Sequence, residues 1–185
     1  MKRSARILNP SHLDGRSKER RFQRTGCDLP ARYIYEGRAH YARMTTISAG
    51  GAYLACNPRE VELNRVLELE FELDGELINA ISRLVWINRG LRNHLGGGLY
   101  APGFAVEYER LSAEARAKID AFVKRSLRIL RALSFELSQR ELDREKISHL
   151  FLSLRPGDSL HLNHIRKVVK QELRHYRLRK DEYSE

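Results

Sequence analysis

Two short groups of residues have the types and the spacing that an anion-binding site needs. The first, residues 20–24 (RRFQR), places Arg20 and Arg24 four residues apart. The second, residues 46–51 (TISAGG), sets the hydroxyl of Ser48 beside two glycines, where backbone can approach a ligand closely. Arginine offers a flat fork of donors to a phosphate and a flat face to an aromatic base, which lysine cannot do. The two groups therefore predict a pocket for an anion, and a nucleotide would use both properties of arginine.

The segments around and after these groups are short and rich in β-forming residues. Turn residues separate the segments, and Asp74-Gly75 is the clearest hairpin signal. Before this turn, apolar residues alternate with glutamate over residues 67–73, which predicts a half-buried strand. Antiparallel strands with no helices between them favour a small closed barrel or a sandwich. Six strands are expected, at residues 29–35, 38–47, 52–55, 66–73, 77–88 and 99–108.

From Ser112 onward the pattern becomes helical. Ser112 is a candidate N-cap, and apolar residues recur at steps of three and four over residues 119–137. A second helix is expected to begin at Asp143 and to end at residues 155–157 (RPG), and a third to begin at residues 158–159. The apolar stripe of the first helix must be buried. It packs either on the rest of its own chain or against another chain, as in a homo-oligomer.

The two anion-binding groups resemble the signature of the PilZ family of cyclic-di-GMP receptors, which is R-x-x-x-R followed by [D/N]-x-S-x-x-G. Arg20 and Arg24 match the first element, and Ser48 and Gly51 match the second. Residues 102–108 (PGFAVEY) are similar to the glycine-led last strand of such domains. The resemblance implies an α+β protein in which a six-stranded antiparallel PilZ-like β-barrel is followed by a C-terminal helical extension.

The resemblance also implies the ligand and the roles of the matched residues. Cyclic-di-GMP, a bacterial second messenger, carries two phosphates and two guanines. Arg20 and Arg24 would neutralise phosphate and hold guanine. Ser48 would form one hydrogen bond, and Gly51 would let the chain pass close to the ligand without a Cβ clash. The resemblance implies no catalytic residue, no metal ligand and no other cofactor.

One position departs from the family pattern. Thr46 stands where the family carries Asp or Asn, whose side chain supplies an acceptor to the guanine edge. Thr46 keeps a hydroxyl oxygen but has no carboxylate. Loss of one charge-assisted hydrogen bond costs roughly 1.5 to 3 kcal/mol, or about ten- to hundredfold in affinity. Binding is therefore expected to be weakened or retuned.

The chain is strongly basic. Its formal net charge is +10 and its pI is about 9.9, which favours an anionic partner: a nucleotide, a nucleic acid or an acidic protein surface. In the leading segment the cations outnumber Asp14 and Glu19. Arg21 is a candidate auxiliary contact to the ligand, and Arg16 is another. The cations of this segment are Lys2, Arg3, Arg6, Arg16, Lys18, Arg20, Arg21 and Arg24.

Length and composition indicate a globular protein with one domain and an appendage. The chain has 185 residues, of which 42% are hydrophobic and 31% charged. We expect a mobile basic tail at residues 1–18, a barrel domain at 19–110 and a helical region at 111–185. The barrel domain includes the segment before the first strand that carries Arg20 and Arg24, which we call the arginine arm. No apolar stretch is long enough to cross a membrane, and the N-terminus lacks the apolar core of a secretory signal. A cytoplasmic protein is expected.

Residue patterns of enzymes and metal sites do not stand out. The chain has no P-loop, no nucleophile elbow and no paired carboxylates in a glycine-rich setting, so we do not expect an enzyme. His161 and His164 lie three residues apart, but no further ligand completes a metal set. Cys27 and Cys56 are expected to be ordinary thiols. Trp86 is expected in the core or in a pocket wall.

The predicted function is a cyclic-di-GMP receptor that converts ligand binding into a change in protein interactions. Two alternatives stay open. The first is a PilZ-like interaction module that binds no nucleotide. The second and less favoured is a regulator that places its last basic helix in a DNA groove. The cations of that helix and its end are Arg166, Lys167, Lys170, Arg174, Arg177, Arg179 and Lys180.

Overall fold

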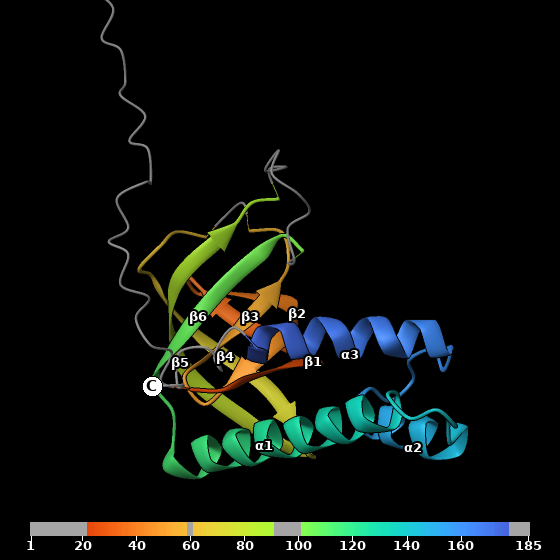
Figure 1. Ribbon diagram of the computed structural model, residues 1–185. Coiled ribbons are helices and arrows are strands. Elements are labelled where there is room, and N and C mark those ends of the chain that lie inside the picture. Colours follow the sequence, from red (N-terminus) through yellow and green to blue (C-terminus); the bar gives the residue numbers. More distant parts are fainter. Residues whose placement is uncertain (1–21, 59–60, 91–100, 178–185) are drawn as a thin grey trace, which may run out of the picture.

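A closed barrel of six antiparallel strands is followed by three helices (Figure 1). The computed structural model describes residues 22–58, 61–90 and 101–177, apart from the side chains of 174–177. Around the barrel the strands follow the order β1-β2-β3-β6-β5-β4. This architecture confirms the predicted fold class. The strands are β1 Arg24–Tyr35, β2 Arg38–Ser48, β3 Gly51–Ala55, β4 Val66–Leu73, β5 Glu76–Asn88 and β6 Gly103–Arg110.

Two strands, β1 and β6, begin more than one residue away from their predicted starts. β1 begins at Arg24 rather than at Leu29, because residues 24–26 pair with the end of β2. A register shift between Gly26 and Leu29 interrupts the regular alternation that would have revealed this part of the strand. β6 begins at Gly103, and residues 91–100, which include the start of the predicted strand, lie outside the described residues.

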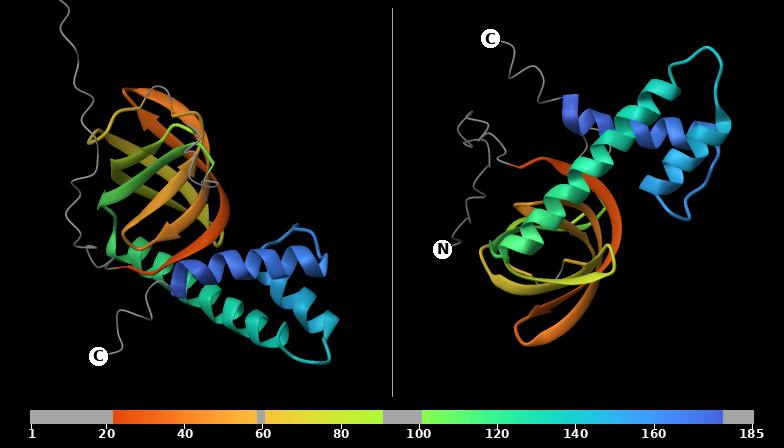
Figure 2. Two further views of the ribbon diagram at one scale, coloured as in Figure 1. Left: turned by 45° about the horizontal axis from the view of Figure 1, so that its top comes forward. Right: turned by 90° about the horizontal axis from the view of Figure 1, so that it is seen from below.

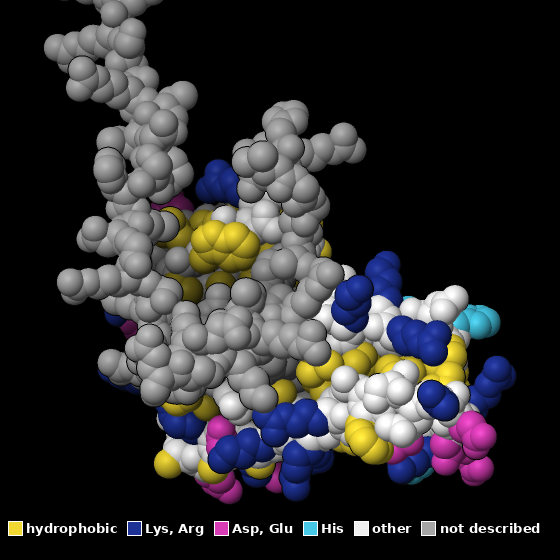
Figure 3. All heavy atoms as spheres, in the orientation of Figure 1, with side chains coloured by type: hydrophobic (Ala, Val, Ile, Leu, Met, Phe, Trp, Pro, Cys, Tyr) yellow, Lys and Arg dark blue, Asp and Glu magenta, His cyan; other side chains and the backbone are white. Residues whose placement is uncertain are grey.

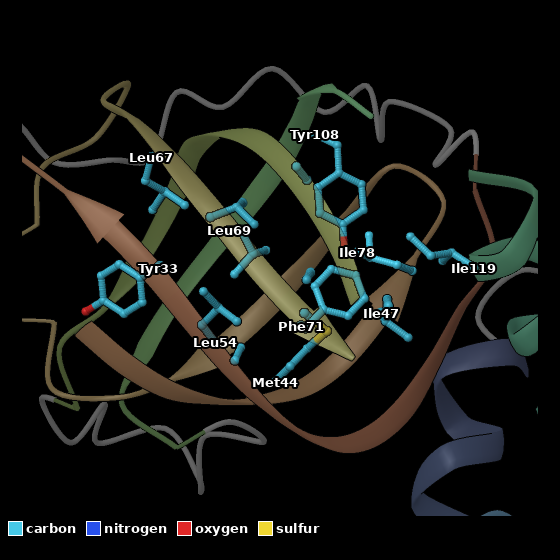
Figure 4. Packing of buried hydrophobic residues seen from close by; sticks show 14 of the residues in the cluster. Tyr33, Met44, Ile47, Leu54, Leu67, Leu69, Phe71, Ile78, Tyr108 and Ile119 are labelled. Atoms are coloured by element: carbon cyan, nitrogen blue, oxygen red, sulfur yellow. The ribbon is translucent and has the colours of Figure 1, made fainter. Parts of the chain in front are cut away.

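The barrel interior is filled by the inward-facing side chains of the strands (Figure 4). β4 shows the predicted alternation, since Leu67, Leu69, Phe71 and Leu73 are each at most 2% exposed. The Asp74-Gly75 turn joins β4 to β5, with φ values of 52° and 80° at its two residues. Both values lie in the left-handed region that two-residue hairpin turns require.

Helix α1 (Ala113–Glu136) connects two hydrophobic cores. Ile119, Val123 and Leu127 join the barrel core, and α1 crosses one end of the barrel (Figure 2). Its second half packs on α2 (Arg144–Leu154) and α3 (Leu162–Arg177). The apolar stripe of α1 is therefore buried by its own chain. The fully buried part of the second core consists of Leu130, Leu133, Ile147, Phe151, Ile165 and Val169.

The ends of α1 and α2 follow their predicted caps, whereas α3 begins later than predicted. Asp143 caps α2 by accepting a 3.0 Å hydrogen bond from the Lys146 amide. α3 begins at Leu162, and its first turn is closed by a 3.0 Å bond from the Ile165 amide to the His161 carbonyl. The apolar face that packs α3 on α1 begins only here, so residues 158–159 stay outside the helix. Among the described helices, none is long and apolar enough to span a membrane.

Replacing the α1 cap tests how strongly the cap holds this helix. The Ser112 hydroxyl oxygen accepts a 3.0 Å hydrogen bond from the Ala115 amide, as the sequence predicted. Ser112→Ala is expected to lower the free energy of unfolding by about 1 kcal/mol. Urea unfolding followed by circular dichroism measures this loss, and Ser112→Asp, which restores an acceptor, should recover it. An unchanged midpoint in Ser112→Ala would show that packing alone positions the start of α1.

Candidate ligand-binding site

The β1–β2 ladder places parts of both sequence motifs on one surface. Arg24 pairs directly with Ser48, and Gly26 pairs with Thr46. Directly opposed residues of an antiparallel pair point to the same face, as do residues two apart on one strand. Ile47, between Thr46 and Ser48, is fully buried in the barrel core. The four paired positions therefore share the outer face of the barrel.

The turn between β2 and β3 is held together by the Ser48 side chain. Its hydroxyl donates to the Gly51 carbonyl at 3.0 Å and accepts from the Gly50 amide at 3.3 Å. The Tyr108 amide on β6 donates to the Gly50 carbonyl at 3.0 Å. Ser48 is only 2% exposed. A hydroxyl has one donor and two acceptor lone pairs, so these two bonds leave one lone pair of Ser48 unused.

Gly51 lies where two strands approach closely. A Cβ atom at this position would overlap the carbonyl oxygen of Val106 on β6. Gly51 pairs with Glu107 in the β3–β6 ladder, so the space beside its Cα is taken by backbone. The sequence predicted that this glycine leaves room for a ligand. The structure shows that it leaves room for a neighbouring strand.

Phe22 anchors the end of the arginine arm to the turn and to α1. Its ring lies against Gly50, where a Cβ atom would overlap it. The Arg116 guanidinium of α1 stands 5.7 Å from the centroid of the same ring. Arg116 also donates to the Ala49 carbonyl through Nη1 at 2.6 Å. A cation over an aromatic face is stabilising, so Arg116 joins the arm to the turn.

Two guanidinium charges act on this end of the barrel. Burial raises the pKa of the Tyr108 hydroxyl, and Cys27 raises it further, whereas the charges of Arg24 and Arg116 lower it. Both arginines therefore lie close enough to Tyr108 to influence its ionisation. Their positive potential extends over the Ser48 turn, where it favours an anionic ligand.

The third helix contacts the same outer face through Glu172. Its Oε2 accepts a 3.1 Å hydrogen bond from the Gly26 amide, and its Oε1 accepts a 2.8 Å bond from Arg155. The side chains of Glu172 and Arg155 are 13% and 22% exposed. The sequence analysis singled out neither Glu172 nor Arg116. No local pattern marks them, because each reaches the site through tertiary packing.

Some of the predicted site residues lie outside the part of the chain that the structure describes. Arg20 and Arg21 lie outside the described residues, as does Arg16. The side chain of Thr46 is half-buried on the outer face, opposite Gly26. Trp86 does not lie in the core, because its side chain is 47% exposed on the barrel surface, beside Tyr53. Alternation from the buried Leu84 would turn Trp86 inward, but a register shift between the two residues turns it to the outer face.

His161, His164 and the two cysteines form neither a metal site nor a disulfide within the described residues. His161 is exposed, and the Nε2 atom of His164 is 3.5 Å from an Asp158 carboxylate oxygen. Within the described part of the chain, no three ligand-type side chains gather as a metal site would require. Cys27 and Cys56 are both free. Burial raises the pKa of the Cys27 thiol to about 12, which keeps it protonated.

Comparison with known proteins identifies a family model and several similar folds. The model described as PilZ domain matches residues 18–125. The comparison with curated proteins gave no match. YcgR from Escherichia coli, solved in complex with c-di-GMP, is similar with 12% identity and a TM-score of 0.51, over 64% of this chain and 50% of that one. MotI/DgrA, the inhibitor of motility from Bacillus subtilis, has 17% identity and a TM-score of 0.49, over 60% of this chain and 52% of its own.

These likenesses describe the fold. The chain spans about half the length of both solved proteins. The family model covers the barrel and the first half of α1, and it ends before α2 and α3. Ile119 and Val123, through which α1 packs on the end of the barrel, thus fall within the matched region.

Proposed function

We propose that this chain, which belongs to the PilZ domain family, is a receptor for cyclic-di-GMP. One observation carries the proposal: the ladder sets Arg24 directly opposite Ser48, beside the turn that ends at Gly51. Two motifs that are separate in the sequence thus meet on the outer face of the barrel. The family match and the fold shared with YcgR support this ligand.

The residues of this face suit a cyclic dinucleotide. The Arg24 guanidinium can bind a phosphate or stack on a guanine, and Arg20 and Arg21 would approach from the arm. A desolvated stacking contact contributes roughly 1 to 2 kcal/mol, and a bidentate bond to guanine or phosphate contributes a similar amount. The free lone pair of Ser48 can accept one further hydrogen bond. Several such contacts together are needed for tight binding.

We propose that ligand binding changes the surface that the helices offer to a protein partner. The arm and the turn contact α1 through Arg116, and β1 contacts α3 through Glu172. A ligand that reorders residues 19–26 would therefore act on both helices. In this scheme residues 19–110 bind the ligand and residues 111–185 transmit the signal, in the cytoplasm and without catalysis. The partner is another protein or a second copy of this chain.

Titration calorimetry of the wild type with cyclic-di-GMP tests the receptor proposal. We expect saturable binding of the cyclic dinucleotide and little heat with GMP, which cannot place two guanines and two phosphates at once. Arg20→Ala should weaken binding, because it removes one of the motif guanidinium groups. Absence of heat with cyclic-di-GMP at high protein concentration would overturn the proposal. It would favour an interaction module that binds no nucleotide.

DNA binding is the alternative that α3 raises. Lys and Arg side chains are spread over the face of the helical region in Figure 3, and Arg166, Lys167 and Lys170 are exposed on α3. Binding driven by phosphate contacts would shift a labelled duplex in a gel and weaken steeply with salt. We expect no such shift.

A further inference from the structure

The carboxylate of Glu172 occupies the place of a missing side chain on the outer face of the barrel. Gly26 has no Cβ, and a Cβ built there would overlap the Glu172 carboxylate. The Gly26 amide donates to Oε2 of Glu172 at 3.1 Å. The end of α3 lies beside the start of β1 in two views of the molecule (Figures 1 and 2). A helix far away in the sequence thus adds an acidic group to this face.

This acidic group lies next to Thr46. Gly26 and Thr46 are directly paired, and the Cβ positions of such a pair are about 4.5 to 5.5 Å apart on the same face. Arg24 and Ser48 form the neighbouring pair on that face. The strands therefore supply a guanidinium and two hydroxyls at these positions, but no carboxylate. Glu172, from α3, brings a carboxylate to this four-residue patch.

Two hydrogen bonds hold the Glu172 carboxylate beside the patch. Arg155, the C-cap of α2, donates to Oε1 at 2.8 Å. The Glu172 side chain is 13% exposed, and its ion pair with Arg155 fixes where the carboxylate lies. Gly26 and Arg155 each use one lone pair, on different oxygens. A carboxylate has about four acceptor sites, so one remains on each oxygen.

We propose that Glu172 reads a guanine of the bound ligand by accepting hydrogen bonds from its N1–H and N2–H groups. This inference rests on the proposed function, since it assigns a residue to the same site. Two adjacent donors on a guanine edge fit the two oxygens of a carboxylate. Adenine presents a donor and an acceptor on that edge, so its N1 lone pair would face the negative charge. Glu172 therefore selects guanine over adenine and makes α3 part of the site.

Calorimetry with cyclic-di-GMP and cyclic-di-AMP tests the role of Glu172. The wild type should prefer cyclic-di-GMP. Glu172→Gln should weaken cyclic-di-GMP binding about tenfold or more. It should also reduce the preference for cyclic-di-GMP over cyclic-di-AMP, because an amide can pair with adenine. Glu141→Gln is the matched control, since Glu141 is exposed between α1 and α2 and its loss changes the net charge equally. Its affinity should stay within about threefold of the wild type.

A second substitution distinguishes recognition of guanine from a structural role of Glu172. In the Glu172→Gln background, Thr46→Asp should restore the preference for cyclic-di-GMP, because it returns a carboxylate to the patch from the paired strand. Arg155→Met removes the same ion pair but keeps the carboxylate. It should weaken both dinucleotides alike, if it weakens them at all. Melting temperatures of all variants show whether the fold is retained.

The outcomes separate this inference from the proposed function. If the wild type binds neither dinucleotide, the receptor proposal itself fails. If the wild type binds cyclic-di-GMP but Glu172→Gln leaves the ratio of the two affinities unchanged, only the role of Glu172 is overturned. The same holds if Thr46→Asp does not restore the preference in a folded double variant.

Discussion

Arg24→Ala is expected to lower the affinity for cyclic-di-GMP roughly a hundredfold, which corresponds to about 2.7 kcal/mol. Arg24 is the only motif arginine whose position the structure describes, and the ladder fixes it opposite Ser48. Its guanidinium can supply both a charge-assisted fork and a stacking face, so both contributions are lost together. Titration calorimetry of the variant and of the wild type measures the change.

Arg38→Ala is the matched control for this variant. Arg38 is exposed at the start of β2, opposite Tyr35, at the other end of the same hairpin. Its removal changes the net charge by the same amount, so it measures the effect of long-range electrostatics alone. We expect a change of less than about threefold. Equal losses in the two variants would show that overall charge, and not the Arg24 contact, attracts the ligand. Arg24→Lys should recover little, because an ammonium cannot form the fork.

Gly51→Ala is expected to lower the free energy of unfolding by about 3 kcal/mol or more. The added Cβ would overlap the Val106 carbonyl oxygen, which belongs to the backbone of β6 and cannot turn away. The β3–β6 ladder would have to separate at Gly51, beside the Ser48 turn. Urea unfolding measures the loss. Ligand binding should fall as well, because the turn carries the second motif.

Gly157→Ala separates this clash from the general cost of replacing a glycine. Gly157 follows α2 with a φ of 81°, and a Cβ atom there would meet no other atom within 4 Å. Only backbone strain is added, which costs about 1 kcal/mol. If Gly51→Ala is no more destabilising than Gly157→Ala, β3 and β6 can move apart cheaply. In that case Gly51 is not required for their packing.

The sequence predicted the parts of the site that a local motif can encode. R-x-x-x-R and S-x-x-G are short patterns, so Arg24, Ser48 and Gly51 could be found without a structure. Their strands were also predictable, apart from the first residues of β1, where the register shift between Gly26 and Leu29 hides the alternation. Arg116 and Glu172 could not be found in this way. Each looks like an ordinary charged residue of an amphipathic helix, and only packing brings it to the barrel.

The sequence alone determined the barrel, the helical extension and the arginine and serine motifs, because hydrophobic periodicity, turn residues and short spacings are local properties. Only the tertiary structure decided how the two motifs face each other and what surrounds them. It shows that Gly51 faces a neighbouring strand and that a carboxylate from α3 lies against Gly26, the ladder partner of Thr46. Contacts between residues far apart in the chain depend on the packing of whole elements. For this reason Arg24 could be predicted as part of the candidate site, whereas Arg116 and the Glu172 carboxylate could not.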